Sequence, residues 1–303
     1  MAEAPPLTTD RLRDRPGAWV DLGLTLPIFL VYHLAVVFLG VQNATDMVTG
    51  TLMTLSAGDK TKYLLGTLCI GVIFAGTFAL LGRGQAFRPR KFLQIVIEGT
   101  VYAFVMAVVA NVVVGSLFAS VATTSGSLAS VATTSGSLAS VATSGSLATD
   151  GVRAASSLAS DGQAGLAAAA GSLASESRFV GFIMSLGAGF YEELTFRVLL
   201  FGVGAKVLVW MFGKQRVELS GTSAAASGFS FRSLLVMGGW AIACAIIFSG
   251  VHYVGPMSDE FKLTSFTFRA VLGLILTLIY VTRGFAAAVW THAIYDVWVL
   301  VLR

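Results

Sequence analysis

Two adjacent glutamates and an arginine lie in an apolar part of the chain. Glu192, Glu193 and Arg197 fall inside a hydrophobic run from Phe179 to Phe212. Each ionisable side chain near a bilayer centre costs about 2.5 to 3.5 kcal/mol, so such residues indicate a functional site. On a helix, Glu193 and Arg197 are one turn apart with the acid nearer the N-terminus, which predicts an ion pair. Glu192 projects in another direction, and its carboxylate is left free to act as a general base.

Two histidine motifs have the same helical spacing. Phe248 and His252 are four residues apart at the end of one apolar segment, and His292 and Asp296 are four apart within another. Each pair therefore shares one face of a helix. The chain has only three histidines, and two of them are in these motifs. A carboxylate and two imidazoles could activate water and bind the oxyanion of peptide hydrolysis.

In chain order, Glu-Glu-x-x-x-Arg, Phe-x-x-x-His and His-x-x-x-Asp resemble the motifs of the CPBP family of intramembrane proteases, which includes the type II CAAX prenyl endopeptidases. The resemblance covers residues 179–301. It implies a glutamate-dependent intramembrane endopeptidase with a conical helical-bundle core and no cofactor. It also implies that Glu192 and His252 activate water, that His292 and Asp296 line the oxyanion side, and that Glu193 and Arg197 support them.

Asp296 departs from the Asn that this family often has at the same place. An ionised carboxylate cannot donate to an oxyanion, but Asp296 could instead hold His292 in one tautomer and make it a better donor. Phe248 and Tyr191 are the candidate substrate contacts, although Phe248 is also suited to packing. The implied substrate is a membrane-anchored or lipidated protein or peptide. The motifs do not choose between a prenylated tail, a leader peptide and a C-terminal sorting anchor.

Two alternatives remain open. The charged residues could form a polar clasp in a non-enzymatic membrane scaffold or bacteriocin-immunity-type protein of the same fold. A zinc-dependent intramembrane protease is the other, because two histidines and a glutamate form a legitimate ligand set. The sequence lacks a His-Glu-x-x-His helix, and Arg197 would repel a divalent ion, so we expect no metal.

The composition predicts an all-α polytopic membrane protein with seven to eight transmembrane helices. Of the 303 residues, 55% are hydrophobic and 12% charged, with a mean hydropathy of +0.80, which excludes an ordinary soluble domain. The net charge of +4 is too small to indicate a nucleic-acid partner. Seven apolar segments are expected to be helices: 19–41, 63–81, 92–118, 179–212, 234–254, 266–281 and 285–302.

Lysines and arginines cluster in alternate loops, so the N-terminus is expected to be cytoplasmic. The expected location is a bacterial inner membrane. Four regions are expected: a polar tail (1–18), a three-helix membrane region (19–118), a disordered loop rich in Ser, Ala, Gly and Thr (119–177) and the catalytic membrane domain (178–303). Gly187 and Gly189 suggest a helix break. The other ionisable residues in apolar segments are not expected to be catalytic: His33 and Glu98 are interpreted as structural, and Lys206 and Arg269 as side chains that extend to the membrane surface.

Overall fold

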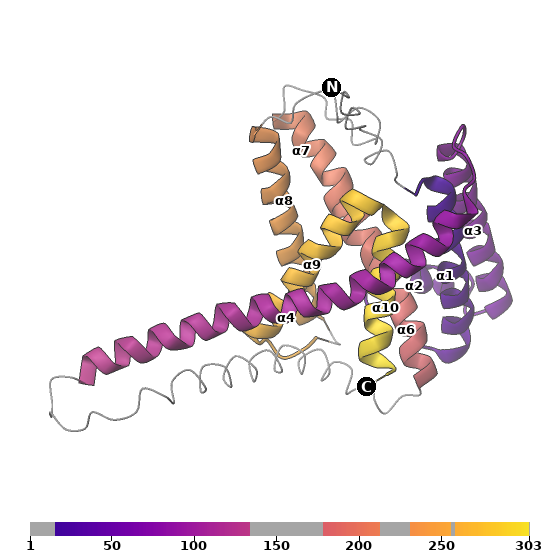
Figure 1. Cartoon of the computed structure of the whole chain (residues 1–303). Coiled ribbons are helices and arrows are strands. Elements are labelled where there is room, and N and C mark those ends of the chain that lie inside the picture. Colours follow the sequence, from indigo (N-terminus) through magenta and orange to yellow (C-terminus); the bar gives the residue numbers. More distant parts are fainter. Residues whose placement is uncertain (1–15, 134–177, 213–230, 256–257, 303) are drawn as a thin grey trace, which may run out of the picture.

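The computed structural model describes residues 16–133, 178–212, 231–255 and 258–302, and these residues form helices without any strand (Figure 1). This confirms the all-α prediction. In chain order the elements are α1 (Ala18–Leu39), α2 (Met47–Leu55), α3 (Lys60–Leu81), α4 (Pro89–Thr133), α6 (Arg178–Glu192), the π-helix η2 (Glu193–Val203), α7 (Gly204–Phe212), α8 (Phe231–Gly250), the 3₁₀ turn η3 (Val251–Tyr253), α9 (Leu263–Arg283) and α10 (Phe285–Leu300).

Five described segments are long and apolar enough to cross a membrane: 18–39, 60–81, 89–119, 234–253 and 263–283. Large apolar side chains such as Leu68, Ile73 and Leu234 are exposed on their outer faces, where they can contact lipid. The chain is an integral membrane protein. The other two predicted segments are also helical, but 178–212 is divided among α6, η2 and α7, and α10 has only 16 residues. The predicted seven to eight spans therefore exceed the five that satisfy these criteria.

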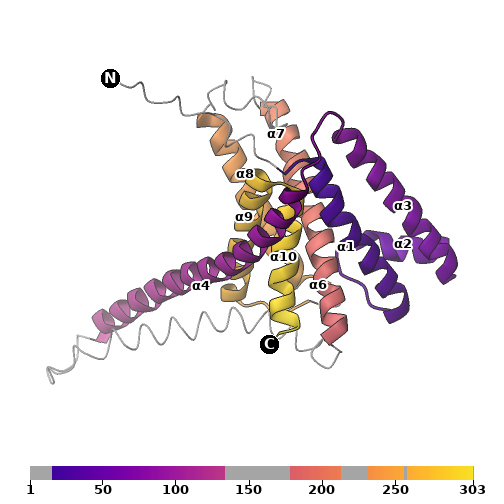
Figure 2. The same cartoon turned by 45° about the vertical axis from the view of Figure 1, so that its right-hand side comes forward.

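Helix α10 lies at the centre of the arrangement. It packs against α1, α4, α6, α9 and η2, and both cartoon views show it between α4 and α6 (Figures 1 and 2). Its residues enter all three clusters of the core, for example Val289 in one, Ala287 in another and Val299 in the third. A helix that is apolar on every side is expected to be buried, because each face needs an apolar partner. This centre carries His292 and Asp296.

The start of α10 is held by a tight turn and by a side chain from α1. Gly284 has a φ of 94°, a left-handed conformation that suits glycine, and it lets the chain reverse directly between α9 and α10. Gly284 offers no side chain to cap the helix. The backbone N–H of Ala286 donates instead to Oδ1 of Asp21 over 2.8 Å. The carboxylate of Asp21 therefore satisfies an end group of α10 that would otherwise lack a partner.

The predicted helix break at Gly187 and Gly189 is wrong, because α6 continues through both residues to Glu192. These glycines instead allow close packing. A Cβ at Gly187 would collide with the ring of Tyr32, and a Cβ at Gly189 would lie 2.9 Å from both the Ala293 nitrogen and the Val289 oxygen of α10. The helical geometry changes later, at Glu193, where η2 begins.

The low-complexity region was expected to be disordered from residue 119, but residues 119–133 continue α4 as helix. This stretch follows an established helix, so each added residue only extends a helix that has already nucleated. In Figures 1 and 2, α4 extends well beyond the other helices. The expectation for residues 134–177 lies outside the described residues, as does that for residues 1–15.

We predict that Gly189→Ala destabilises the protein. The added methyl group would meet the backbone of α10, which cannot move aside as a flexible side chain could. Overpacking of this kind costs about 1 to 3 kcal/mol. The measurement is the midpoint of thermal unfolding of the purified protein in detergent.

Gly238→Ala is the matched control, because Gly238 is an exposed residue within α8 with no atom within 4 Å of its would-be Cβ. Alanine there should leave stability unchanged or raise it by about 0.5 to 1 kcal/mol. An equal effect of the two substitutions would contradict the proposed close packing of α6 against α10.

Candidate active site

The two glutamates lie at the junction of an α-helix and a π-helix. Glu192 is the last residue of α6 and Glu193 the first of η2, which extends over 11 residues. π-Helical segments are rare and occur frequently at functional sites. Both side chains are buried: the exposed fraction is 8% for Glu192 and zero for Glu193. The junction therefore places two carboxylates inside the protein, where each needs polar or charged neighbours.

Glu193 links η2 to α10. Its Oε1 atom lies 3.0 Å from Nη1 of Arg197, which confirms the predicted ion pair. The same oxygen accepts a hydrogen bond of 2.7 Å from Nδ1 of His292. Arg197 is itself covered by the ring of Phe248, with 4.2 Å from its Cζ to the ring centroid. Glu193 therefore balances the charge of Arg197 and, through the hydrogen bond from Nδ1, orients the ring of His292.

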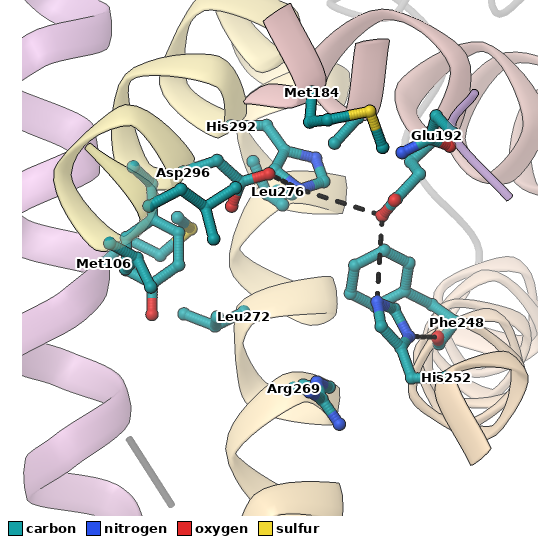
Figure 3. Close-up of a pocket in the computed structure, with 15 residues that line it drawn as sticks. Met106, Met184, Glu192, Phe248, His252, Arg269, Leu272, Leu276, His292 and Asp296 are labelled. Carbon is teal, nitrogen blue, oxygen red and sulfur yellow. Dashed lines mark hydrogen bonds and ion pairs between the residues drawn. The ribbon is translucent and has the colours of Figure 1, made fainter. Parts of the chain in front are cut away.

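Glu192 faces two imidazoles. Its Oε2 atom is 4.0 Å from Nε2 of His252 and 3.8 Å from Nε2 of His292, and Figure 3 shows the carboxylate between them. These distances are too long for direct hydrogen bonds but leave room for a shared small molecule such as water. Nδ1 of His252 donates a 2.8 Å hydrogen bond to the carbonyl oxygen of Phe248. In the neutral imidazole, Nε2 is then the unprotonated nitrogen, and it points toward Glu192.

Asp296 lies beside His292, as the four-residue spacing predicts, but it does not have the role expected from the sequence. Its Oδ2 atom is 3.6 Å from Nε2 of His292, whereas Nδ1 is bound by Glu193. The tautomer of His292 is therefore set by Glu193, and the expectation that Asp296 sets it is wrong. The reason is that Glu193 approaches from a different helix at hydrogen-bonding distance, while Asp296, one turn along α10, only reaches the other side of the ring.

These groups line a cavity of about 180 Å³. Its polar wall contains Glu192, His252, His292 and Asp296, together with Asn43 from the loop after α1 and Arg269 from α9. Its apolar wall is formed by Met106, Met184, Ala188, Phe248, Leu272, Leu276, Tyr295, Val299 and Leu300. The cavity thus combines groups suited to acid–base chemistry with a surface suited to aliphatic side chains.

The structure separates the two candidate substrate contacts. Phe248 lines the cavity and also packs edge-on against Phe196 at 5.2 Å. Tyr191 is buried against α1, where its hydroxyl forms a short hydrogen bond with His33, and it is not among the residues lining this cavity. Neighbouring helical residues point about 100° apart, so Tyr191 faces α1 when Glu192 faces the cavity. The expectation that Tyr191 contacts substrate is not supported by this placement.

Two polar residues of the cavity were missed by the sequence analysis. Arg269 was interpreted as a side chain extending to the membrane surface, but it is only 2% exposed and lines the cavity, so that interpretation is wrong. Asn43 is 7% exposed and lies far from the motifs in the chain. The position of Arg269 within an apolar segment could have indicated that it belongs to the site. No sequence signal marked the second, because loop packing decides its position.

A metal site is not formed by the described residues as they stand. Among them, no three His, Cys, Asp or Glu side chains are arranged so that they could hold one ion. Cys69 is exposed and Cys244 buried, and neither forms a disulfide. Whether the active protein uses zinc therefore stays a prediction to be tested.

Comparison with known proteins bears on the C-terminal part of the chain. Residues 174–298 match the family model described as type II CAAX prenyl endopeptidase Rce1-like. No curated protein and no solved structure matches the chain. The matched region contains the acid pair, Arg197, both histidines of the cavity and Asp296. Residues 174–298 are therefore similar to the Rce1-like type II CAAX prenyl endopeptidase family, which supports a relationship of this part of the chain to the CPBP family proteases.

Proposed function

We propose that this protein is a glutamate-dependent intramembrane endopeptidase in which Glu192 and His252 activate water. The observation that carries the proposal is the placement of the Glu192 carboxylate 4.0 Å from Nε2 of His252 and 3.8 Å from Nε2 of His292, in the cavity that all three side chains line. The match of residues 174–298 to the family model supports protease activity, and the geometry supports the assignment of roles. A purely structural clasp would not need a second glutamate beside the Glu193–Arg197 pair.

In the proposed reaction, water binds between Glu192 and His252. Its hydrogens point to the carboxylate and to the unprotonated Nε2, which directs an oxygen lone pair at the scissile carbonyl carbon. Glu192 takes one proton as the new C–O bond forms. The carboxylic acid so produced then gives that proton to the departing amine nitrogen as the C–N bond breaks. The products are a carboxylic acid and an amine, and Glu192 returns to its ionised form.

His292 is the proposed donor to the oxyanion. Its Nδ1–H is engaged by Glu193, so only a doubly protonated ring can donate from Nε2 toward the cavity. Glu192, Glu193 and Asp296 are all within 3.8 Å of this ring, which places three carboxylates around it to balance the positive charge. Asp296 then acts by holding the Nε2 proton in position, not as a donor itself.

The proposed substrate is a membrane-associated or lipidated peptide. The apolar wall from Met106, Met184, Leu272 and Leu276 suits aliphatic side chains beside the scissile bond, and membrane helices surround the cavity. A bacterial inner-membrane location is also part of this proposal. The cytoplasmic N-terminus rests on the distribution of lysines and arginines.

We predict that Glu192→Gln lowers the rate of peptide cleavage by about 10² to 10⁴-fold, since an amide cannot accept the proton from water. His252→Ala should cause a loss of similar size, because the second acceptor for water disappears. Cleavage of a prenylated reporter peptide by purified protein in detergent or vesicles measures both effects.

The matched control is Glu260→Gln, which makes the same chemical change at an exposed residue near the start of α9. It should retain full activity. All variants should be extracted from the membrane in equal amounts and have the same unfolding midpoint as the parent. Unimpaired cleavage by the Glu192 and His252 variants would refute the assigned roles.

A second prediction concerns metal. If Glu192 and His252 activate water directly, cleavage should persist after exhaustive dialysis against a strong chelator, and the purified active protein should contain far less than one zinc per chain. Chelation that abolishes cleavage, with recovery on adding zinc, would instead make Glu192, His252 and His292 candidate ligands.

A third prediction separates the possible roles of Asp296. Asp296→Asn should stay within about tenfold of the parent rate, a change of about 1.4 kcal/mol or less, because the amide keeps a polar group beside Nε2 of His292 and can itself donate. Asp296→Leu should lose more activity, since it offers neither. If Asp296→Asn and Asp296→Leu impair cleavage equally, the ionised carboxylate itself is required. A polar group beside Nε2 of His292 would then not be enough.

A further inference from the structure

The catalytic cavity lies toward one end of the helices that form it. Three of its residues lie where helices end: Asn43 follows α1, His252 follows α8 within η3, and Leu300 is the last residue of α10. Two others lie in the first two turns of helices, Met184 in α6 and Arg269 in α9. The cavity is therefore located where α1, α8 and α10 end and where α6 and α9 begin.

Contacts between these helix ends show that they share one side of the bundle. The backbone N–H of Asp259, which precedes α9, donates to the carbonyl oxygen of His252 over 3.0 Å. A Cβ at Gly181, near the start of α6, would lie 3.1 Å from the carbonyl oxygen of Leu300. In both cartoon views α10 ends at the lower side, whereas α7 reaches the upper side (Figures 1 and 2). We call the side with the cavity the cavity end.

The opposite ends of the helices are also joined to one another. Asp21, in the first turn of α1, accepts from the backbone N–H of Ala286 at the start of α10 over 2.8 Å. Nε1 of Trp19 in α1 donates to the carbonyl oxygen of Gly82, which follows α3, over 3.0 Å. Because α7 runs away from the cavity and α8 runs toward it, α7 ends and α8 begins on this side too. We call this side the far end.

Lysine and arginine side chains are concentrated at the far end. The described residues there are Arg83, Arg88, Arg90, Lys91, Lys206, Arg232 and Arg283, and the sequence adds Arg11, Arg13 and Arg15 before α1 and Lys214 and Arg216 between α7 and α8. The described residues at the cavity end are Lys60, Lys62, Arg178 and Lys262, and the sequence adds Arg153 between α4 and α6 and Arg303 after α10. Cytoplasmic loops carry an excess of lysine and arginine, so this distribution favours a cytoplasmic far end.

The reacting groups become more accessible toward the cavity end. The side chain of His252, beyond the end of α8, is 27% exposed, against 10% for Glu192 and 7% for His292. In the other direction along η2, Glu193 and Arg197 are buried. Water and substrate therefore reach Glu192 from the cavity end.

We propose that the cavity opens on the extracytoplasmic side of the membrane and that its substrates are exported polypeptides that are anchored in the membrane. The inference rests on the proposed function and deepens it, because it names the substrate class. A tail lipidated in the cytoplasm stays at the inner surface of a hydrocarbon layer about 30 Å thick, whereas the cavity opens at the outer surface. The C-terminal anchor of an exported protein instead places the peptide that precedes it beside the cavity end.

Orientation is measured first, by a labelling experiment that does not need catalysis. The full-length chain is expressed in bacteria with Cys69→Ser and Cys244→Ala, which removes both native cysteines. Single cysteines then replace exposed, uncharged residues, namely Ser258 and Thr61 at the cavity end and Ala86 at the far end. The reagent is a maleimide that cannot cross the membrane.

Ser258→Cys and Thr61→Cys should be labelled in spheroplasts and should lose this labelling in inside-out vesicles. Ala86→Cys is the matched control and should behave in the opposite way. All three should be labelled equally in detergent, which shows that each cysteine reacts when it is accessible. Labelling of Ser258→Cys and Thr61→Cys only in inside-out vesicles, or from both sides, would overturn the inference.

Cleavage is then measured with the parent protein in the same two preparations, relative to Glu192→Gln membranes. The probe is a pool of fluorogenic peptides of varied sequence, each with a C-terminal acyl chain as its anchor. Charged residues at the N-terminus keep each peptide on the side to which it is added. Spheroplasts should cleave the pool, and inside-out vesicles should cleave it only after detergent is added.

The two measurements separate this inference from the proposed function. If the cysteines are labelled as expected but neither preparation cleaves the pool even in detergent, the endopeptidase assignment fails and the orientation stands. If intact inside-out vesicles cleave the pool and spheroplasts do not, the endopeptidase assignment stands and the extracytoplasmic opening fails.

Discussion

The buried carboxylate of Glu193 is the group on which the catalytic arrangement depends. It is fully buried and bound on one side by Arg197 and on the other by Nδ1 of His292. A carboxylate in this environment must keep both partners, because losing either leaves an uncompensated charge or donor. The contact fixes the distance between η2 and α10. It also turns Nε2 of His292 toward Glu192, which places the second imidazole of the site.

The N-terminal helices contribute to this site although they lie outside the region that matches the protease family. Asp21 of α1 satisfies the first turn of α10, and His33 of α1 contacts the hydroxyl of Tyr191, the residue before Glu192. Met106 of α4 and Asn43 reach the cavity itself. The matched region therefore supplies the reacting groups, and the remaining helices hold the two glutamates and α10 in position.

The two arginines that are buried in the described part of the chain have different partners. Arg197 contacts Glu193, the ring of Phe248 and, over 3.5 Å, the carbonyl oxygen of Gly273, so its partners come from η2, α8 and α9. Arg269 has one carboxylate partner, supplied by a residue of the segment that precedes α9. The environment of the first is suited to a structural support.

Local periodicity decided what could be predicted from the sequence. The apolar segments determined an all-helical membrane protein, and the four-residue spacing determined that Glu193 pairs with Arg197, because residues one turn apart must lie close together. Only the tertiary structure decided that Glu193 also binds His292, 99 residues away, that Gly189 touches the backbone of α10 and that Arg269 enters the cavity. These contacts join different helices, and their distances depend on how helices pack, which spacing along one helix does not specify.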